Sequence, residues 1–300
     1  MERTVDPLPG PGRTAVLVAG ARAAESARPD PLFDDPFARK FAEAASAASP
    51  ALAEALAQGS GDPAVNQARQ DSIAVRTRFF DDYLVAAAGS GCRQVVLVAA
   101  GLDVRAFRLG WPEGVRLWEI DMPEVFAFKE RVLADCGAIA GCARTVIAAD
   151  LREDWPHKLL ENFDLPFDPG LATAWLIEGL MMYLDEAERD LLLDRVGALS
   201  GAGSRIALDH SPGFFARPTL TSPEDPSGAR AAVRFAALAA AAASDRSLTA
   251  PKEWLAGHGW RAKVEDPAAI FARYGRRVPA QLKPAAAGLA RAWMATGMRE

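Results

Sequence analysis

The chain has 300 residues, half of them hydrophobic, and its 34 lysines and arginines against 39 aspartates and glutamates give a net charge of −5. This composition predicts a sizeable folded core, and the negative balance argues against nucleic acid as a partner, because nucleic-acid-binding domains usually carry clustered basic residues. The apolar runs fall short of the roughly 20 residues that a membrane span needs. Three cysteines without a C-x-x-C pair indicate a reducing compartment, so we expect a cytoplasmic protein with no membrane partner.

The N-terminal third is predicted to be helical. Residues 1–13 hold many prolines and glycines and few apolar side chains, so we expect a flexible arm there. Residues 14–89 show helical spacing of apolar side chains, which predicts a helical cap with one helix over Asn66 to Ala88. Asp35 followed by Pro36 is typical of a helix N-cap with proline at the first helical position.

Residues 90–300 show a different pattern, in which short apolar runs alternate with helical segments. Such alternation is typical of βαβ units and of a parallel sheet covered on both faces, so we predict a doubly wound α/β domain. The predicted strands are Gln94 to Ala100, Val115 to Ile120, Thr145 to Ala149, Thr173 to Ile177 and Ser204 to Asp209, with further ones at Trp260 to Val264 and Leu289 to Ala295. The predicted helices are Pro123 to Asp135, His157 to Asn162 and Glu186 to Leu199. An insertion at about 211–250 interrupts the alternation and holds an alanine-rich helix at Ala229 to Ala243.

An acidic residue stands at the end of each of the first four predicted strands. These residues are Asp103, Asp121, Asp150 and Glu178. Ligands of open parallel sheets bind outside the carboxyl ends of the strands, so the four side chains are candidates for one site. Asp121 follows Gly101 by 20 residues, the spacing at which a carboxylate reaches the ribose hydroxyls of an adenosine-containing ligand. Alternatively, Asp121 caps the helix that begins at Pro123.

Four stretches carry a family resemblance. They are AAGLDVR at 99–105, WEIDMP at 118–123, Asp150-Leu151 followed by Trp155, and EGLMMYL at 178–184. In this order they resemble the motifs of the leucine carboxyl methyltransferase-like family, and in particular its actinobacterial branch of S-adenosylmethionine-dependent O-methyltransferases. One departure concerns the first stretch, which in the family usually reads GAGLDTR: here Ala99 replaces the first glycine and Val104 the threonine.

The resemblance implies a class I methyltransferase, with a Rossmann-like doubly wound sheet, an N-terminal helical cap and a helical lid. It also implies S-adenosylmethionine as cofactor and methyl transfer to an oxygen, carboxylate or hydroxyl. The phenylalanines of the cap and the insertion suggest that the acceptor is a small hydrophobic molecule. The implied cofactor-binding residues are Arg76, Gly101, Asp103, Asp121, Asp150, Leu151 and Glu178. Among them, Asp121 would bind the ribose, Asp150 and Leu151 the adenine, and Glu178 the methionine side. Arg76, or alternatively Arg78, would pair with the cofactor carboxylate.

The acceptor determines which catalytic residues are needed. A carboxylate acceptor is already ionised, whereas a hydroxyl would need a base. His210, at the end of the fifth strand, is the histidine best placed for that role, with a structural role as the alternative, and Tyr183 could orient the acceptor. Five phenylalanines of the cap and the insertion suggest an apolar acceptor pocket: Phe33, Phe37, Phe214, Phe215 and Phe235. No His/Asp/Glu group has metal-ligand spacing, and RYGRR at 273–277 is predicted to be a solvated turn.

Two other classes of function stay open. An NAD-dependent oxidoreductase would share the acid after the second strand, but it would need a G-x-G-x-x-G turn, and here Gly101 is followed by Leu102, Asp103 and Val104. A non-catalytic member of the fold, acting as a binding protein, is suggested by Ala99, because an extra methyl group near the cofactor could weaken binding. Cofactor affinity separates these possibilities.

Overall fold

A single mixed sheet forms the centre of the molecule. The computed structural model describes residues 8, 11–59, 62–210, 245–279 and 292–300. Its seven-stranded sheet has the order β3-β2-β1-β4-β5-β7-β6. The strands are β1 (Gln94–Val98), β2 (Arg116–Asp121), β3 (Ala143–Ala148), β4 (Thr173–Ile177), β5 (Arg205–His210), β6 (Arg261–Glu265) and β7 (Trp293–Met298). The first five strands run parallel, and β7 is antiparallel to both β5 and β6.

The order of the strands reverses between β1 and β4. Strand β1 pairs with β2 on one side and with β4 on the other, so the chain winds outward from this point in both directions. The predicted doubly wound sheet is therefore confirmed. In such sheets a ligand binds at the reversal point, beyond the carboxyl ends of the strands.

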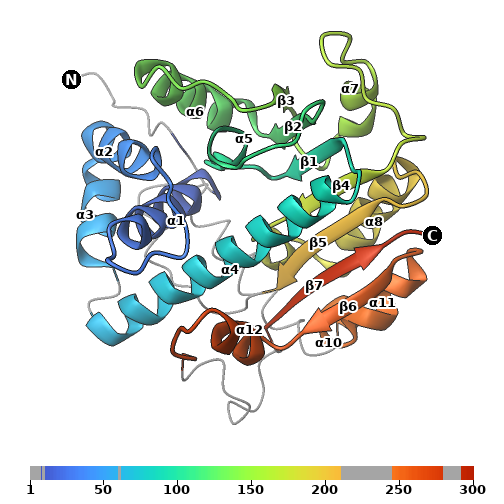
Figure 1. The fold of residues 1–300 in the computed structure, drawn as a ribbon. Coiled ribbons are helices and arrows are strands. Elements are labelled where there is room, and N and C mark those ends of the chain that lie inside the picture. Colours follow the sequence, from blue (N-terminus) through green and yellow to red (C-terminus); the bar gives the residue numbers. More distant parts are fainter. Residues whose placement is uncertain (1–7, 9–10, 60–61, 211–244, 280–291) are drawn as a thin grey trace.

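Helices cover both faces of the sheet (Figure 1), and side chains alternate between the two faces along each strand. On one face, Trp118 and Trp175 pack with residues of α7 (Trp155–Leu160), α8 (Glu186–Ala198) and α11 (Pro251–Gly257). On the other face, Val95 and Leu97 pack against the long helix α4 (Pro63–Gly89) and against α12 (Pro267–Arg273). Every residue of β1 and β4 is buried, which explains their continuous apolar runs.

The N-terminal helices form a cap beside the sheet. They are α1 (Pro11–Ser26), α2 (Ala38–Ala48) and α3 (Pro50–Gln58). Phe41 of α2 packs against Phe128 of α6 (Pro123–Asp135), with 6.3 Å between ring centroids, so the cap joins the core through α6. The remaining elements are the short helices α5 (Arg105–Arg108), η1 (Met181–Tyr183) and α10 (Arg246–Thr249).

Several boundaries differ from the predicted ones. Helix α1 begins at Pro11, inside the segment predicted as an arm, and Leu8 is buried in the cluster that joins cap and α6. Helix α2 begins at Ala38 and not directly after Asp35, although Asp35 Oδ1 still accepts the backbone N–H of Ala38 at 2.8 Å. Strand β7 lies at 293–298, later than predicted. The alanine-rich helix at 229–243 and the three phenylalanines of the insertion lie outside the described residues.

The RYGRR segment is more than a solvated turn. The buried side chain of Arg276 donates to Glu25 and to Asp30, each at 2.7 Å, and so ties the end of α12 to the N-terminal cap. That part of the prediction was wrong because the partners are about 250 residues away in sequence. In the regions for which the structure gives positions, no helix has the length and apolar character that a bilayer crossing requires.

Candidate functional site

The turn after β1 is held by the acid at the end of β2. Gly101 has a φ of +51°, and its backbone N–H donates to Asp121 Oδ2 at 2.6 Å. The N–H of Met122 donates to Asp121 Oδ1 at 2.7 Å, and α6 has no side-chain cap, so the alternative role as a helix cap is not observed. Burial raises the pKa of Asp121, and the two N–H groups oppose that rise. Each carboxylate oxygen keeps a second lone pair, so Asp121 can accept two further hydrogen bonds.

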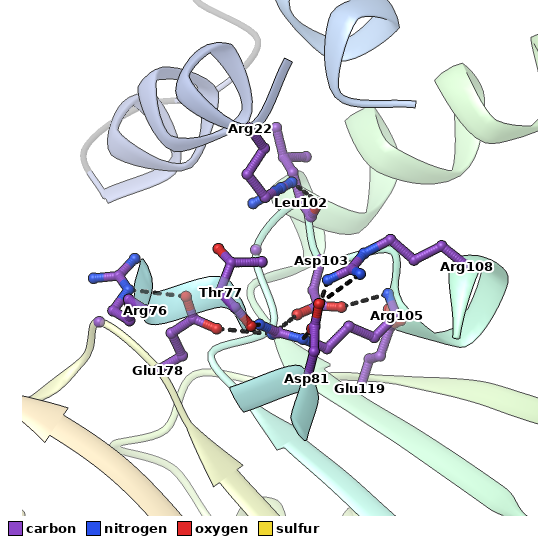
Figure 2. Close-up of polar contacts among 12 residues, drawn as sticks. Arg22, Arg76, Thr77, Asp81, Leu102, Asp103, Arg105, Arg108, Glu119 and Glu178 are labelled. Carbon is purple, nitrogen blue, oxygen red and sulfur yellow. Dashed lines mark hydrogen bonds and ion pairs between the residues drawn. The ribbon is translucent and has the colours of Figure 1, made fainter. Parts of the chain in front are cut away.

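Glu178, at the end of β4, is held between two arginines (Figure 2). Arg76 Nε donates to its Oε1 at 2.9 Å, and Arg105 Nη1 donates to its Oε2 at 2.7 Å. Although burial opposes ionisation, the two guanidinium groups hold the pKa of Glu178 below its usual range. Glu178 therefore stays ionised at the edge where the sheet order reverses.

Arg105 is the centre of this polar network. Its side chain donates to Asp81 at 2.6 Å and to the carbonyl of Thr77 at 3.2 Å, and it also pairs with Asp103 in the turn. Arg105 is only 2% exposed, and the neighbouring carboxylates raise its pKa well above the usual value despite burial. Burial opposes ionisation of Asp103, but the charge of Arg105 lowers the pKa of Asp103. One side chain thus joins α4, the turn after β1 and the end of β4.

Arg76 lies at the site, but it already has partners in the protein. Besides Glu178, its Nη1 lies 3.6 Å from Asp209 Oδ2 at the end of β5. Gly179 has a φ of +69°, and a Cβ there would come within 3.4 Å of Arg76 Nη1, so the chain lies close to the guanidinium at this point. Arg78 instead pairs with Asp82 and donates to the carbonyl of Leu32, so it does not join Glu178.

The end of β3 carries a more exposed pair. Asp150 forms an ion pair with Arg152, whose Nε and Nη2 groups both donate to the carboxylate and whose side chain is 72% exposed, and this contact lowers the pKa of Asp150. Exposed pairs contribute little free energy, about 0–1 kcal/mol, so a ligand amine can compete with Arg152. Leu151 follows, half-buried against the core, and its carbonyl accepts from Arg195 at 2.8 Å.

Helix α1 of the cap lies against the turn. Arg22 donates to the carbonyl of Leu102 at 2.6 Å and to Asp35 at 2.7 Å. A Cβ added to Gly101 would lie 3.4 Å from the Cβ of Ala15 in α1. The hydroxyl of Tyr183 lies 3.2 Å from that of Thr14 in the same helix, and burial raises the pKa of Tyr183.

His210 lies at the end of β5 and is 3% exposed. Neither ring nitrogen has a hydrogen-bond partner among the residues that have assigned positions. Burial, and then the charge of Arg189, lower its pKa to about 4, so the ring is neutral at neutral pH. Asp209, its neighbour on the strand, faces the opposite side of the sheet, where it contacts Arg76.

Two of the predicted pocket residues are packed within the protein. Phe33 lies under the guanidinium of Arg108 at 5.2 Å from the ring centroid, and Phe37 packs edge-on against Phe107 at 5.8 Å. In the part of the chain that the structure describes, no group of three or more histidine, cysteine or acidic residues is arranged to hold a metal ion.

Sequence reasoning missed Arg105 and Asp209. Arg105 is the last residue of the AAGLDVR stretch, and Asp209 is a fifth acid at the end of a strand. Asp209 Oδ1 accepts the backbone N–H of Gly179 at 2.7 Å, so it holds the end of β4. A count of strand-end acids extended to the fifth strand would have found Asp209.

The strand order and the acidic carboxyl edge define a doubly wound, Rossmann-like α/β protein. More narrowly, the chain belongs to the leucine carboxyl methyltransferase family, whose sequence profile matches residues 15–197. A protein of Parafrankia is 42% identical over 91% of this chain and 84% of its own length, and one of Mycobacterium ulcerans is 40% identical over 89% of both. Both carry the name of S-adenosyl-L-methionine-dependent methyltransferases. The predicted family is confirmed, and with it the methyltransferase class in place of the oxidoreductase alternative.

A solved structure from Thermobifida fusca, described as that of a candidate methyltransferase, is also similar to this chain. The similarity covers 95% of this chain and 94% of that one, with 15% identity and a TM-score of 0.49.

Proposed function

We propose that the chain binds S-adenosylmethionine at the carboxyl ends of β1 to β4 and transfers its methyl group to a carboxylate oxygen of a small hydrophobic molecule. The observation that carries the proposal is the half-buried carboxylate of Asp121, which is fixed by the N–H groups of Gly101 and Met122 at the reversal point of the sheet. The name of the family, leucine carboxyl methyltransferase, supports a carboxylate as the acceptor.

The donor set fits such a cofactor. The lone pairs left on Asp121 would accept the two ribose hydroxyls. Asp150 would accept the adenine amine after releasing Arg152, and Leu151 would pack on the ring. Gly101 and Asp103 would shape the turn around the ligand.

The charged residues around Glu178, where the methionine part of the cofactor would lie, also fit this cofactor. Three arginines and four acids form one network there: Arg76, Arg105, Arg108, Asp81, Asp103, Glu178 and Asp209. The excess of negative charge favours a cationic ligand. Within this network, Arg76 is the candidate partner of the cofactor carboxylate.

S-adenosylmethionine, when bound, supplies a methyl group on a positively charged sulfur. The work left to the chain is to place the acceptor oxygen and to exclude water. An ionised carboxylate needs no base, which agrees with a His210 whose low pKa makes it a weak one. Tyr183 keeps its proton because its pKa is raised, so its hydroxyl would donate to the acceptor in exchange for its hydrogen bond to Thr14.

Calorimetric titration tests the cofactor site. We expect S-adenosylmethionine and S-adenosylhomocysteine to bind with micromolar dissociation constants and NAD not to bind. Asp121→Asn should weaken binding by at least about tenfold, because the amide nitrogen cannot accept a ribose hydroxyl and would face one of the two backbone N–H donors. Asp135→Asn, on the exposed end of α6, is the matched control. Equal affinity of the two variants would refute the role of Asp121.

The acceptor is tested by transfer of a labelled methyl group to aliphatic or aromatic carboxylic acids and to the matching alcohols. We expect esters to form from the acids, with little change in His210→Gln. Transfer to the alcohols alone, lost by about 100-fold or more in His210→Gln, would instead assign a hydroxyl acceptor with His210 as the base. Tight cofactor binding with no transfer to either would support the binding-protein alternative.

A further inference from the structure

A groove of about 390 Å³ lies at the opposite edge of the sheet, where β5 begins. Helices α4 and α12, the first residues of β5 and β6 and the last residues of β7 line it. Strand β5 runs from Arg205 to His210, which corresponds to about 16 Å, so the groove is well separated from the carboxyl edge. It does not belong to the cofactor site.

Arg205 is the arginine that β5 contributes to the groove, next to Cys92. It is half-buried at the start of β5, and no carboxylate in the described ranges forms an ion pair with it. Its neighbour is the buried thiol of Cys92, whose pKa is raised by burial. A guanidinium offers donors in one plane, which match the two oxygens of a carboxylate or of a phosphate.

Aromatic side chains form part of the lining. The hydroxyl of Tyr83 donates to the carbonyl of Trp175 at 3.1 Å, and that of Tyr274 donates to Asp82 at 2.9 Å. Because both hydroxyls already have partners in the protein, the rings are what the two tyrosines can offer a ligand. Phe79 adds a third ring. A flat, apolar ligand body fits this lining.

Cations also surround the groove. Arg261, Lys263 and Arg273 line it, and they pair with Glu300 and Glu265 at the surface. Exposed pairs of this kind contribute about 0–1 kcal/mol, so an anion can compete for these cations. The acid that lines the groove, Asp82, is already engaged by Arg78 and by Tyr274.

We propose that this groove is a second ligand site and that it takes a planar aromatic anion. The carboxylate or phosphate of the ligand would bind Arg205, and its ring would pack against Tyr83 and Tyr274. The cations at the surface would add attraction that decreases with salt. The proposal is independent of the cofactor site and of the acceptor.

The test is calorimetric titration of the full chain with 1-naphthyl phosphate, 1-naphthoate and inorganic phosphate, in the presence of S-adenosylhomocysteine. We expect at least one naphthyl anion to bind, and inorganic phosphate to bind at least about tenfold more weakly, because it lacks the ring. The stronger of the two naphthyl anions identifies the phosphate or the carboxylate as the preferred group.

Arg205→Gln should weaken binding by at least about tenfold, since the charged bonds to the anion are lost. Arg131→Gln is the matched control, because Arg131 is an exposed arginine over an aromatic ring, Phe128, on a different helix. Thermal unfolding checks that both variants fold. Should Arg205→Gln fail to fold, Tyr274→Leu is expected to show a similar loss of affinity.

Three results would overturn the proposal. One is the absence of binding of both naphthyl anions at millimolar concentration. Another is an unchanged affinity in a folded Arg205→Gln or Tyr274→Leu variant. The third is tighter binding of the anion when S-adenosylhomocysteine is left out, which would put the anion at the carboxyl edge.

Discussion

At the scale of single residues, Ala99 has the most unusual backbone of the site. Its φ is +54°, and it is the one non-glycine residue with a positive φ in the part of the chain that the structure describes. This conformation costs an alanine about 1–2 kcal/mol. A glycine would adopt this conformation without that cost, so the alanine leaves the turn under strain.

Replacing Ala99 with glycine is expected to stabilise the protein. The relief of strain exceeds the entropy that glycine adds to the unfolded chain, about 0.4–1 kcal/mol, so we expect a net gain of up to about 1 kcal/mol in the free energy of unfolding. Urea denaturation measures it. Ala100→Gly, at a neighbouring residue without a positive φ, should instead lose about 0.5–1 kcal/mol. A loss in both variants would show that Ala99 is not strained.

The acids of the site could be predicted from the sequence, whereas their partners could not. Asp121 and Glu178 follow apolar runs directly, and parallel strands bring their ends to one edge. Arg76 meets Glu178 across 102 residues of sequence, through the packing of α4 on the sheet. Nothing local to an arginine on a helix marks which carboxylate it will contact.

At the scale of elements, the contact between α1 and the turn after β1 links the cap to the cofactor site. The side chain of Arg22 bridges Asp35 and the carbonyl of Leu102, and it is largely buried. The cap is therefore attached at Leu102, between Gly101 and Asp103, the two turn residues that would contact the cofactor.

Arg22→Gln tests this link. We expect the free energy of unfolding to fall by about 1–3 kcal/mol, because a buried carboxylate and a carbonyl lose a charged donor. The dissociation constant of S-adenosylmethionine should rise as well, since the turn is less well held. Arg39→Gln is the control, because Arg39 in α2 is 76% exposed and pairs only weakly with Glu43. If Arg22→Gln is less stable but binds S-adenosylmethionine with unchanged affinity, the cap contributes to stability and not to cofactor binding.

Elements with strong local signals were predicted well. Helix α6 has the predicted bounds, Pro123 to Asp135, because proline marks its first turn and Gly137 follows its end. The start of α1 was misplaced, because its prolines and glycines suggest an irregular segment, whereas Leu8 is buried in the cap. Strand β7 was placed a few residues early, since an antiparallel strand takes its register from its neighbours.

At the scale of the whole molecule, His210 makes stability depend on pH. In the unfolded chain an ordinary histidine binds a proton below about pH 6.5. In the folded protein burial lowers the pKa to about 4, so the unfolded state binds more protons between these values. Stability therefore falls as the pH falls from 6.5 to about 4, by up to about 3 kcal/mol for a shift of this size.

His210→Gln should remove this part of the pH dependence. Urea denaturation at a series of pH values measures it, and His157→Gln, at an exposed position in α7, should keep the wild-type slope. If His210→Gln keeps that slope too, folding does not lower the pKa of His210. The low pKa, and the argument that His210 is a weak base, would then both be wrong.

The position of β7 also has a consequence for how the protein is made. Strand β7 follows β6 in the chain, yet it lies between β5 and β6 in the sheet. During synthesis β6 is therefore made before its neighbour in the sheet, β7. Translation of residues 266–292, which separate the two strands, takes about 1–5 s at ordinary rates. Over that interval the outer side of β5 is an open strand edge, a template for pairing with the wrong chain. The risk of aggregation should therefore be greatest while the last strand is still being translated.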